Sequence, residues 1–531
     1  MILTEHLGPY VQYLAIAANE SFIVGEKVQE QRKRLFYMRI YIFTRKMQKN
    51  VKEGECSVCG KNAKLKCSDC RRSFYCSKEH QKEDWPRHKS ICHAWEIKEN
   101  EEVGRYLVAS RDLTIGEAII SEGPLVWGAA PHTRNRVCIG CGLHCEDVEA
   151  RCTKCFWPSC SINCQALFAK DGHELECALL AKTRIFPRCD VLLAIRMLIL
   201  WKTKSKRWKL LEKLQSHENA RGPGTEAYEE VQEVKKHLGP LIAVDPSCAK
   251  ILPKICGLID VNALETVPPD GSVAIYRTAC LLEHRCLANT RHSFALDEKG
   301  RPIITVLAVT SIKKGEHLST NYTHALWSTR ARRQHLLATK YFSCSCERCA
   351  DPTELGTHLG TLRCPYNDAG LVLPIDPLNF ETEWSCNKCQ GTLRASEVTE
   401  LTDRLEEEVE EAMRSPNKAA FSDLLSRLRA LLHPGHQHCI SLGHSLIQLL
   451  PSRDPLKLEL CKLIMNTVAA IDPYYARLTL YAAITLRELA YCPGQDKKAH
   501  LSKAATLLMS EPPKSPGAKL LRLINSELEY A

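Results

Sequence analysis

Two long clusters of cysteine and histidine constrain the fold of this chain more than any other feature. A C-x2-C pair brings two thiolates to one ion from a tight turn, and an x3 spacing puts two ligands on one face of a helical turn. Such soft ligands suit zinc, and eight of them suit two tetrahedral ions rather than a chance gathering of buried thiols. The first cluster supplies Cys56, Cys59, Cys67, Cys70, Cys76, His80, His88 and Cys92.

The second cluster repeats this order of ligands. Two further residues, His144 and Cys145, lie between its first two pairs and are not expected to bind metal. Neither cluster has the spacing that presents a reading helix to DNA, so we expect no sequence-specific DNA recognition. The eight residues are Cys138, Cys141, Cys152, Cys155, Cys160, Cys164, His173 and Cys177.

Length and cysteine usage bound the class of protein. A chain of 531 residues is too long for one ordinary core, so several domains are expected. The 28 cysteines would suggest disulfides in a small secreted protein, but C-x2-C pairs in a large chain favour metal thiolates.

Apolar and charged segments give expectations about location. The longest apolar run, residues 191–201, is interrupted by Arg196 and is shorter than the roughly 18 to 20 residues that cross a bilayer, so we expect no membrane span. The first residues lack the order of a secretory signal, which predicts an intracellular protein of the cytoplasm, the nucleus or both. The net charge of +10 is concentrated in residues 27–50, with eight Lys or Arg against one Glu. This basic arm is either a handle for an acidic partner or a solvated extension.

Apolar alternation punctuated by glycines predicts short strands in residues 103–128 and again in 301–323. These two β-rich stretches flank the second cluster and a helical segment. After residue 400 the spacing of Leu401, Leu405, Val409 and Met413 is helical. Asp454-Pro455 and Asp472-Pro473 are typical of an N-cap followed by the first helical residue.

Local motifs around the first cluster, including "YC", "HQ" and "H-x3-C", resemble those of MYND zinc fingers, with His80 where cysteine is usual. MYND fingers are protein-binding modules with interleaved zinc sites. From residue 56 to the end, the order of segments resembles SET and MYND protein-lysine methyltransferases. The motifs "GRYL", "EH-x-C" and "KYFSC-x-C-x-RC-x-DPTELGT" are closest to the arthropod branch, which has an additional N-terminal finger.

This resemblance implies a multidomain α+β fold. A β-rich SET domain would be split by a MYND finger and a helical insert, and followed by a zinc-bound post-SET segment and a TPR-like helical domain. The expected boundaries are a basic arm at 1–54, the first finger at 55–95, the split SET domain with post-SET at 103–350, a zinc-ribbon-like connector at 351–395 and the helical tail at 400–531. Within the SET domain, the second finger spans 138–177 and the insert about 185–245.

The resemblance also implies an activity, which is transfer of the methyl group of S-adenosylmethionine to a lysine of a histone or another protein. Tyr322 matches the catalytic tyrosine. Glu283 stands where the family has asparagine, and a carboxylate cannot donate a hydrogen bond as an amide can. The bulky Tyr106 takes the place of a second glycine. The implied cofactor-binding residues are Gly104, Arg105, Tyr106, Asn262, Glu283, His284, Asn289, Tyr322 and Phe342.

The post-SET motif explains an isolated cysteine. The C-x-C-x2-C run leaves a tetrahedral zinc one ligand short, and the mapping supplies Cys286 as the fourth. About five structural zinc ions follow from this site and the two fingers. The implied post-SET ligands are Cys286, Cys344, Cys346 and Cys349.

Three interpretations stay open at this level. Cys364, Cys386 and Cys389 are either a zinc ribbon with Asn367 in place of the fourth cysteine, where Asp368 could substitute, or a zinc-free remnant. The run "HPGHQHC", with His433, His436, His438 and Cys439, suggests metal binding but is more typical of a polar turn between helices.

The third alternative concerns the whole protein. Instead of an enzyme, the chain could be a catalytically inactive SET scaffold that binds partners through its fingers and tail, for example in transcriptional co-repression. For the enzyme we expect a protein substrate, protein partners at the fingers and tail, and a monomer.

Overall fold

The computed structural model describes most of the chain from residue 54 onward. The predicted arm up to residue 53 lies outside the described residues, as do Cys70, Cys141, His144, Cys145 and Asp368. The described ranges are 54–67, 73–101, 103–130, 138–140, 150–162, 164, 173–185, 189–266, 272–297, 301–367, 369–475, 477–509, 511 and 515–530.

Strands from two distant stretches of the sequence form one β-rich unit, as predicted. β7 pairs antiparallel with β15 in the order β14-β15-β7, and β8 pairs antiparallel with β12. β13 pairs in parallel with β16, so that Glu283 faces Ser319 and His284 faces Thr320. The first stretch contains β5 (Trp95–Asn100), β6 (Gly104–Ala109), β7 (Ala118–Glu122) and β8 (Val126–Ala129), and the second contains β11 (Leu264–Glu265), β12 (Ser272–Ile275), β13 (Glu283–His284), β14 (Thr290–Leu296), β15 (Pro302–Ala308) and β16 (Ser319–Thr320).

The core of this unit follows from strand alternation. Every second residue of β15, from Pro302 to Ala308, is buried, because successive side chains of a strand point to opposite faces. Helix α6 is almost entirely apolar and packs with α10 against the same core. The helices between the two β stretches are α5 (Glu174–Thr183), α6 (Cys189–Lys202), α7 (Trp208–Leu211), η2 (Glu218–Ala220), α8 (Glu226–His237), α9 (Gly239–Val244) and α10 (Ser247–Asn262), with η3 (Ala279–Leu281) after β12.

In the described residues, both cysteine clusters place short strands before a helix that carries ligands. In the first, β1 (Gly54–Glu55), β2 (Asn62–Ala63), β3 (Leu65–Lys66) and β4 (Phe74–Tyr75) precede α3 (Lys78–Cys92). In the second, β9 (Ala150–Arg151) and β10 (Pro158–Ser159) precede α5. His88 and Cys92 share one face of α3, as their spacing predicts. The prediction of a helical turn was wrong for Cys76, because Ser77 caps the helix by accepting from the His80 N–H and leaves Cys76 before it.

The C-terminal part is helical, and a small sheet connects it to the rest. The sheet has the antiparallel order β17-β18-β19-β20. Its strands and the neighbouring helices are α11 (Thr329–Lys340), α12 (Glu347–Ala350), β17 (Leu362–Arg363), β18 (Leu371–Pro374), β19 (Trp384–Cys386), β20 (Thr392–Leu393), α13 (Ala395–Arg414), α14 (Lys418–Leu431), α15 (Gln437–Leu446), α16 (Pro455–Ile471), α17 (Thr479–Ala490), α18 (Lys497–Leu508) and α19 (Pro516–Leu528).

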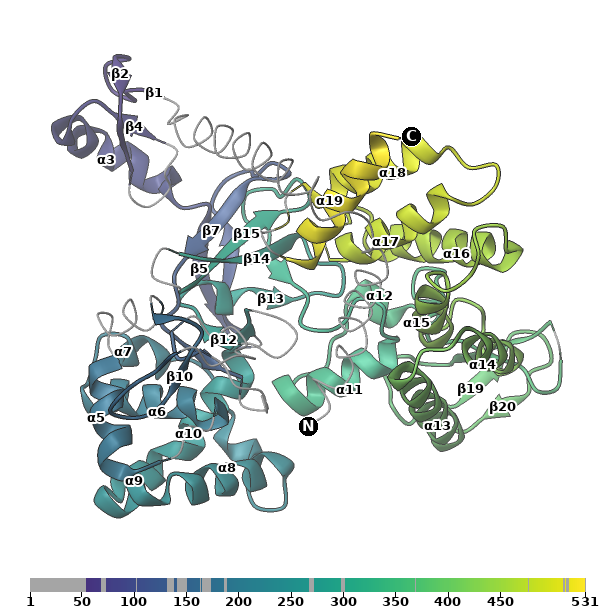
Figure 1. Cartoon of the computed structure of the whole chain (residues 1–531), viewed down its shortest axis with the longest axis horizontal. Helices are drawn as coiled ribbons and strands as arrows, with labels where there is room; N and C mark the ends of the chain where they lie inside the picture. Colours follow the sequence, from purple (N-terminus) through teal and green to yellow (C-terminus); the bar gives the residue numbers. More distant parts are fainter. Residues whose placement is uncertain are drawn as a thin grey trace, which may run out of the picture.

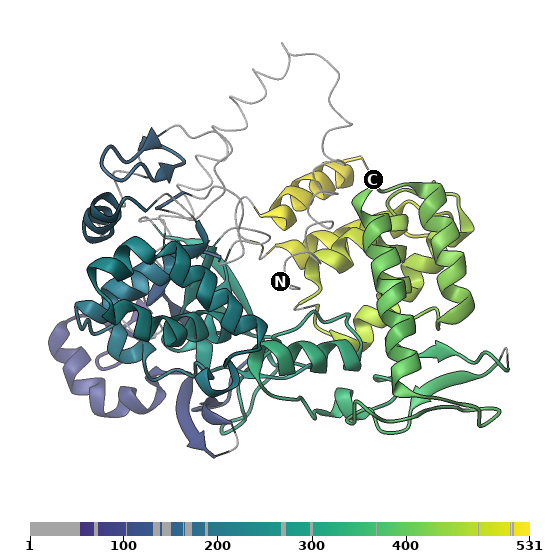
Figure 2. The same cartoon turned by 90° about the horizontal axis from the view of Figure 1, so that it is seen from below.

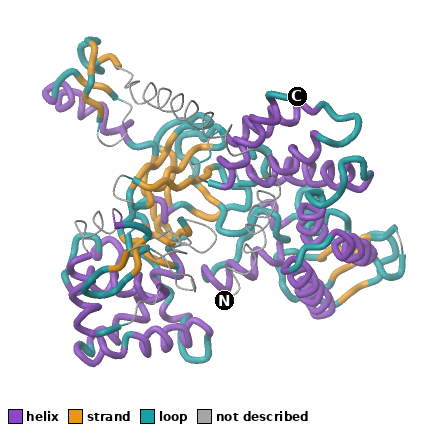
Figure 3. Tube along the Cα trace, in the orientation of Figure 1, coloured by secondary structure: helices purple, strands orange, loops and turns teal. Residues whose placement is uncertain are grey.

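The β-rich unit lies between two helical masses. Helices α5 to α10 cover one side, α13 to α19 lie on the other, and the first finger projects from one end of the molecule (Figure 1). The view from below shows the same separation of the insert helices from the tail (Figure 2), and the strands concentrate in the middle (Figure 3). No described helix is long and apolar enough to span a membrane.

Two aspartates behave differently from each other in the tail. Asp454 caps α16 by accepting from the Leu456 N–H, and Pro455 is the first helical residue, as predicted. The same prediction was wrong for Asp472, which ends α16. Its carboxylate accepts from the N–H groups of Arg477 and Leu478. It therefore holds the two residues that precede α17, which begins only at Thr479.

The histidine-rich run forms the predicted turn only up to His436, whereas His438 and Cys439 lie buried in the first turn of α15. Nδ1 of His433 accepts from the Gly435 N–H at 3.0 Å, and Nδ1 of His436 accepts from the His438 N–H at 3.2 Å. These imidazoles therefore satisfy main-chain donors between α14 and α15, which is the interpretation that the sequence favoured.

A buried histidine makes the tail sensitive to acid. His444 stacks on Tyr481 with 3.5 Å between ring centroids, and burial lowers the pKa of its imidazole to about 3. The unfolded chain takes up this proton below about pH 6.5, so between pH 6.5 and 3 the unfolded state binds more protons and folding stability falls as the pH drops.

We expect His444→Phe to remove this contribution, which amounts to roughly 1 kcal/mol at pH 5.5. The measurement is the free energy of urea unfolding at pH 7.5 and 5.5 by circular dichroism. The loss of stability between the two pH values should be smaller in His444→Phe than in the natural chain. His500→Phe, in the same tail, is the matched control, and an equal loss in all three proteins would contradict the assignment.

Candidate functional site: zinc clusters and an aromatic cluster

The first finger contains two interleaved groups of ligands. Sγ of Cys59 lies 3.6 Å from Sγ of Cys76, and Nδ1 of His80 lies 3.1 Å from Sγ of Cys76. Cys56, Cys59, Cys76 and His80 converge as one group, which is the first pair with the third. Cys67, His88 and Cys92 converge as the other, and the remaining member of their pairs, Cys70, is outside the described residues.

The second cluster has the same interleaved plan. Cys138, Cys160 and Cys164 form one group and Cys152, Cys155, His173 and Cys177 form another, with Cys141 outside the described residues. The thiols are 3.4 to 3.5 Å apart for Cys138 with Cys164 and for Cys152 with Cys177. A disulfide needs about 2.05 Å, whereas two thiolates on one zinc are about 3.8 Å apart for Zn–S bonds of 2.3 Å. The geometry therefore fits zinc rather than disulfides.

A buried carboxylate orients the histidine of this group. Glu176 Oε1 lies 2.9 Å from Nδ1 of His173, which leaves Nε2 facing Cys155. Its other oxygen accepts from Nε of Arg196 at 2.9 Å, and Arg196 also donates to the carbonyl groups of Trp127 and Ile139. Burial opposes ionisation of Glu176, but Arg196 and His173 hold the pKa of the carboxyl below its usual value. Arg196, which interrupts the apolar run of α6, thus ties the second finger to the β-rich unit.

A four-thiolate group joins β13 to the segment after α11. Cys286, Cys344, Cys346 and Cys349 converge, and Sγ of Cys286 lies 3.5 Å from Sγ of Cys349. The fully buried Arg332 donates to the sulfurs of Cys286 and Cys349 at 3.2 and 3.4 Å. Zinc with four thiolates carries a net negative charge, which this guanidinium offsets.

The family motif after the last thiol supports the same group. Glu354 lies 2.7 Å from Arg332 and 3.2 Å from Arg348, and both guanidinium groups are fully buried. A buried charge needs a partner, so Glu354 keeps Arg332 in place beneath the thiols. The sequence motif contains Arg348 and Glu354 but not Arg332, which lies earlier in α11, and it does not indicate this contact.

Three aromatic rings from separate segments meet beside this group. The ring centroid of His284 lies 5.4 Å from that of Tyr322 and 5.9 Å from that of Phe342. Nδ1 of His284 accepts from the Tyr322 N–H at 3.0 Å. Burial lowers the pKa of His284 to about 3, so the imidazole is neutral and can accept this bond.

Tyr322 presents a protonated hydroxyl. Its Oη donates to the carbonyl oxygen of Leu282. Burial raises the pKa of the phenol above its ordinary value of about 10, so the group is neutral at physiological pH. Phe342 meets Tyr322 edge-on and remains 36% exposed, so one side of this cluster faces solvent.

The two residues that depart from the family pattern are linked through His317. Oε2 of Glu283 lies 2.5 Å from Nδ1 of His317, and the ring of Tyr106 stacks on His317 with 4.6 Å between centroids. Glu283 and Tyr106 are therefore parts of one contact chain. The sequence analysis singled out both of them but missed His317, because nothing in the motif "GEHL" signals this pairing.

The other predicted cofactor residues border the segment between α7 and η2. Arg105 donates to the Lys213 carbonyl at 2.7 Å, and Asn262 donates to the Gln215 carbonyl at 2.8 Å. Gly104 has φ of +69°, and a side chain built there would meet no atom within 4 Å. The positive φ explains the glycine, and the open space leaves room for a ligand against the main chain.

Asn289, directly before β14, links two separate segments of the main chain. Its Nδ2 donates to the His317 carbonyl at 2.8 Å, and its Oδ1 accepts from the Ser319 N–H at 2.9 Å. Both ends of the amide are thus bonded to the segment from His317 to Ser319. Asn289 therefore holds the start of β14 against this segment.

Arg477 is a site residue that the sequence analysis missed. It lies between α16 and α17, and its Nη1 donates to the carbonyl of Asn321, directly before Tyr322, at 2.7 Å. Burial lowers the pKa of its guanidinium to about 10, so the group is still charged at neutral pH. The tail therefore contributes a positive charge beside the aromatic cluster.

Comparison with known proteins identifies the family. Residues 56–92 match the model of the MYND finger. SET domain-containing protein SmydA-8, isoform B, of Drosophila melanogaster is 30% identical over 58% of this chain and 70% of its own length. This chain is a SET and MYND domain protein. The family that the sequence motifs predicted is thereby confirmed.

Other matches have lower identity or cover less of the chain. Histone-lysine N-methyltransferase Smyd1 of Mus musculus is 24% identical over 64% of this chain and 74% of its own length. Egl nine homolog 1 of Homo sapiens is 58% identical over 38 residues, which are 7% of this chain and 9% of that protein. The crystal structure of the SET domain of LSMT bound to lysine and AdoHcy is 13% identical with a TM-score of 0.27 over 85% of this chain and 90% of that one, a score too low to transfer any geometry.

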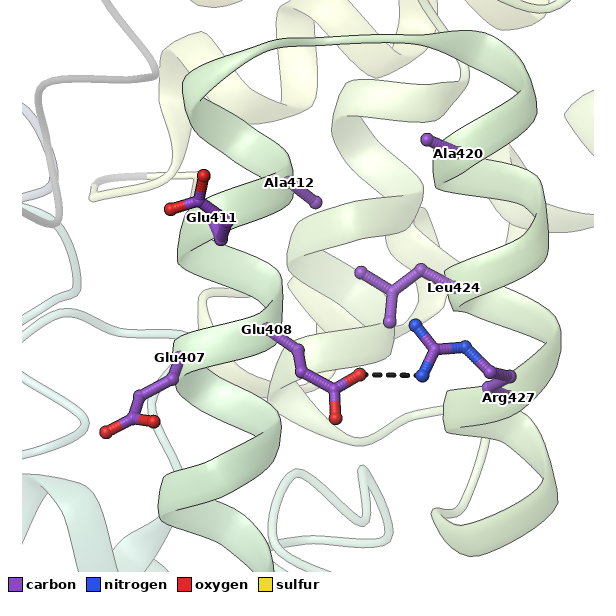
Figure 4. Close-up of a pocket in the computed structure, with 7 residues that line it drawn as sticks. All are labelled: Glu407, Glu408, Glu411, Ala412, Ala420, Leu424 and Arg427. Atoms are coloured by element: carbon purple, nitrogen blue, oxygen red, sulfur yellow. Dashed lines mark hydrogen bonds and ion pairs between the residues drawn. The ribbon is translucent and has the colours of Figure 1, made fainter.

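One groove of this SET and MYND protein lies elsewhere, on the helical tail. It runs between α13 and α14 and is lined by Glu407, Glu408, Glu411, Ala412, Ala420, Leu424 and Arg427. Glu408 points across it to Arg427, 2.8 Å away (Figure 4). None of the predicted site residues lines this groove, so it belongs to the tail and is separate from the aromatic cluster.

Removing the carboxylate that orients His173 should weaken zinc binding in the second finger. We expect Glu176→Gln to reduce the zinc affinity of that group by roughly 10- to 100-fold, the usual effect of losing such an outer partner. The measurement is the transfer of zinc from the full chain to a chromogenic chelator. Glu174→Gln, exposed on the same helix, is the matched control. Equal release from both variants would show that the contact does not tune the metal.

Proposed function

We propose that this chain is a protein-lysine N-methyltransferase that uses S-adenosylmethionine, acting on a histone or another protein. The observation that carries this proposal is the convergence of Tyr322, His284 and Phe342 from three separate segments. Membership of the SET and MYND family supports the reaction class. Its relative Smyd1 is named as a histone-lysine methyltransferase.

Tyr322 is the residue that orients the substrate amine in this proposal. Methyl transfer needs amine, methyl carbon and sulfur in line, and holding reactants in that geometry supplies much of the rate. A neutral phenol beside the Leu282 carbonyl gives fixed polar atoms for this purpose. Tyr322 thus acts by position and hydrogen bonding rather than as an ionised base.

The substrate lysine must lose its proton before it attacks. A free lysine has a pKa of about 10.4, which desolvation and a nearby positive charge both lower. Arg477 places such a charge next to Asn321 and Tyr322, inside the same buried region. The helical tail would therefore help to supply a neutral amine.

S-adenosylmethionine would supply the methyl group as an electrophile on a positively charged sulfur. The open main chain at Gly104 would accommodate it, with Arg105 and Asn262 on the adjoining segment. Phe342 would stack near its adenine and His284 would border it. The two fingers and the post-SET thiols would hold zinc structurally, while protein partners bind at the fingers and the tail.

A second function is favoured by one observation. The carboxylate of Glu283 is engaged by His317, and the ring of Tyr106 lies on the same imidazole. If these side chains take the place of the cofactor's methionine end, the protein is a SET scaffold that recruits partners through its MYND fingers and tail.

Calorimetric titration of the zinc-loaded full chain with S-adenosylmethionine separates the two functions. For the enzyme we expect binding by the natural chain and by Tyr322→Phe. The same Tyr322→Phe chain should lose methyl transfer to core histones or a lysine peptide library by on the order of a hundredfold, the usual effect of losing one hydrogen-bonding group in a transition state.

The matched variant is Glu283→Asn, which restores the amide of the family. Binding by Glu283→Asn alone would identify the natural chain as a scaffold. Absence of binding in both chains would reject the cofactor assignment altogether.

A further inference from the structure

Three cysteines of the connector sheet meet outside the sites described above. Cys364 follows β17, Cys386 ends β19 and Cys389 lies in the turn that leads to β20. Sγ of Cys364 lies 3.5 Å from Sγ of Cys389. This distance is too long for a disulfide and close to the separation of about 3.8 Å between thiolates on one zinc.

A glycine brings the third sulfur into the same place. A Cβ at Gly370 would lie 2.5 Å from Sγ of Cys386 and 2.9 Å from Cβ of Cys364. Because no side chain fits there, the two cysteines pack against the same piece of main chain. The three residues thus form one compact group rather than separate buried thiols.

Main-chain donors surround the sulfurs as they do in the second finger. The Tyr366 N–H donates to Sγ of Cys364 at 3.4 Å, and the Lys388 N–H donates to Sγ of Cys386 at 3.3 Å. In the second finger the Gly140 N–H donates to Sγ of Cys138 at 3.4 Å, again two residues after the cysteine. Such donors favour the thiolate, which is the form that binds metal.

Among the described residues this group has no fourth cysteine or histidine, and Asp368, which could substitute, lies outside them. Asn367 takes the position of the second cysteine in a C-x2-C pair, and its Oδ1 accepts from the Ala369 N–H at 3.0 Å. The Asn367 side-chain oxygen therefore stabilises the turn between β17 and β18. The sequence contains no histidine and no further cysteine between residues 365 and 432 apart from Cys386 and Cys389.

We propose that Cys364, Cys386 and Cys389 bind a zinc ion through three thiolates and leave its fourth position to water. Cys389 is exposed, so the open position faces solvent. Three protein ligands and one exchangeable position make this zinc more labile than zinc held by four protein ligands.

The proposed ion lies where the sheet supports the tail. Cys364 and Cys386 are buried in the same core as Val372, Trp384 and the apolar faces of α13 and α14, and β19 and β20 lie beside these helices in Figure 1. β17 also forms a bridge from Leu362 to Leu432 at the end of α14. The zinc would hold together the base on which the helical tail is packed.

Zinc counting on the purified full chain tests this site without reference to methyl transfer. We expect the natural chain and Asn367→Cys to contain the same amount of zinc by mass spectrometry, and Cys389→Ser to contain one ion less. Cys389 is exposed, so its replacement should leave the fold intact, and Lys388→Ser is the matched control. Cys386→Ser serves as a second variant at a buried ligand.

Release to a chelator tests the open position. The added thiol of Asn367→Cys should slow loss of one zinc by roughly tenfold or more relative to the natural chain, while Asn367→Ala should not. Equal zinc in the natural, Cys389→Ser and Cys386→Ser chains would overturn the proposal. So would an extra ion that appears only in Asn367→Cys, because the natural site would then be empty.

Discussion

The cluster of His284, Tyr322 and Phe342 depends above all on the four-thiolate group that brings Cys286 to Cys344, Cys346 and Cys349. His284 precedes one of these ligands by two residues, and Phe342 precedes another by two residues. A zinc ion held by these thiolates would therefore fix the distance between two rings that are far apart in the sequence. The buried Arg332 offsets the negative charge of the thiolates, and Glu354 in turn offsets the cost of burying the Arg332 charge.

The tail is attached to the rest of the protein at two separate places. Arg477 reaches the carbonyl before Tyr322, and the connector sheet provides an apolar base for α13 and α14. The Asp472 carboxylate accepts a hydrogen bond from the Arg477 N–H and thereby fixes the main-chain position from which the Arg477 side chain extends. Packing of the tail therefore positions Arg477 beside the aromatic cluster, although Tyr322 packs with the post-SET cysteines and the tail helices have cores of their own.

Ligand spacing and strand alternation were predictable from the sequence because both are local. The interleaved groups of the fingers and the pairing of the split β stretches followed from them together with the family resemblance. The contact of Glu283 with His317 was not predictable, since β13 and the segment before β16 are brought together only by the tertiary fold. Arg477 was missed for the same reason, and Asp472 was misassigned because its carboxylate bonds residues further along the chain than an N-cap does.

The split of the β-rich unit also affects the order of folding during synthesis. β7 obtains its partner β15 only after the second finger and α5 to α10 have left the ribosome. Until then the apolar face of β7 is exposed, and contacts so distant in sequence form slowly. The nascent chain therefore passes through a stage in which β7, α6 and α10 have been made but the strand β15 that completes their common core has not, and this stage is where chaperone assistance would matter most.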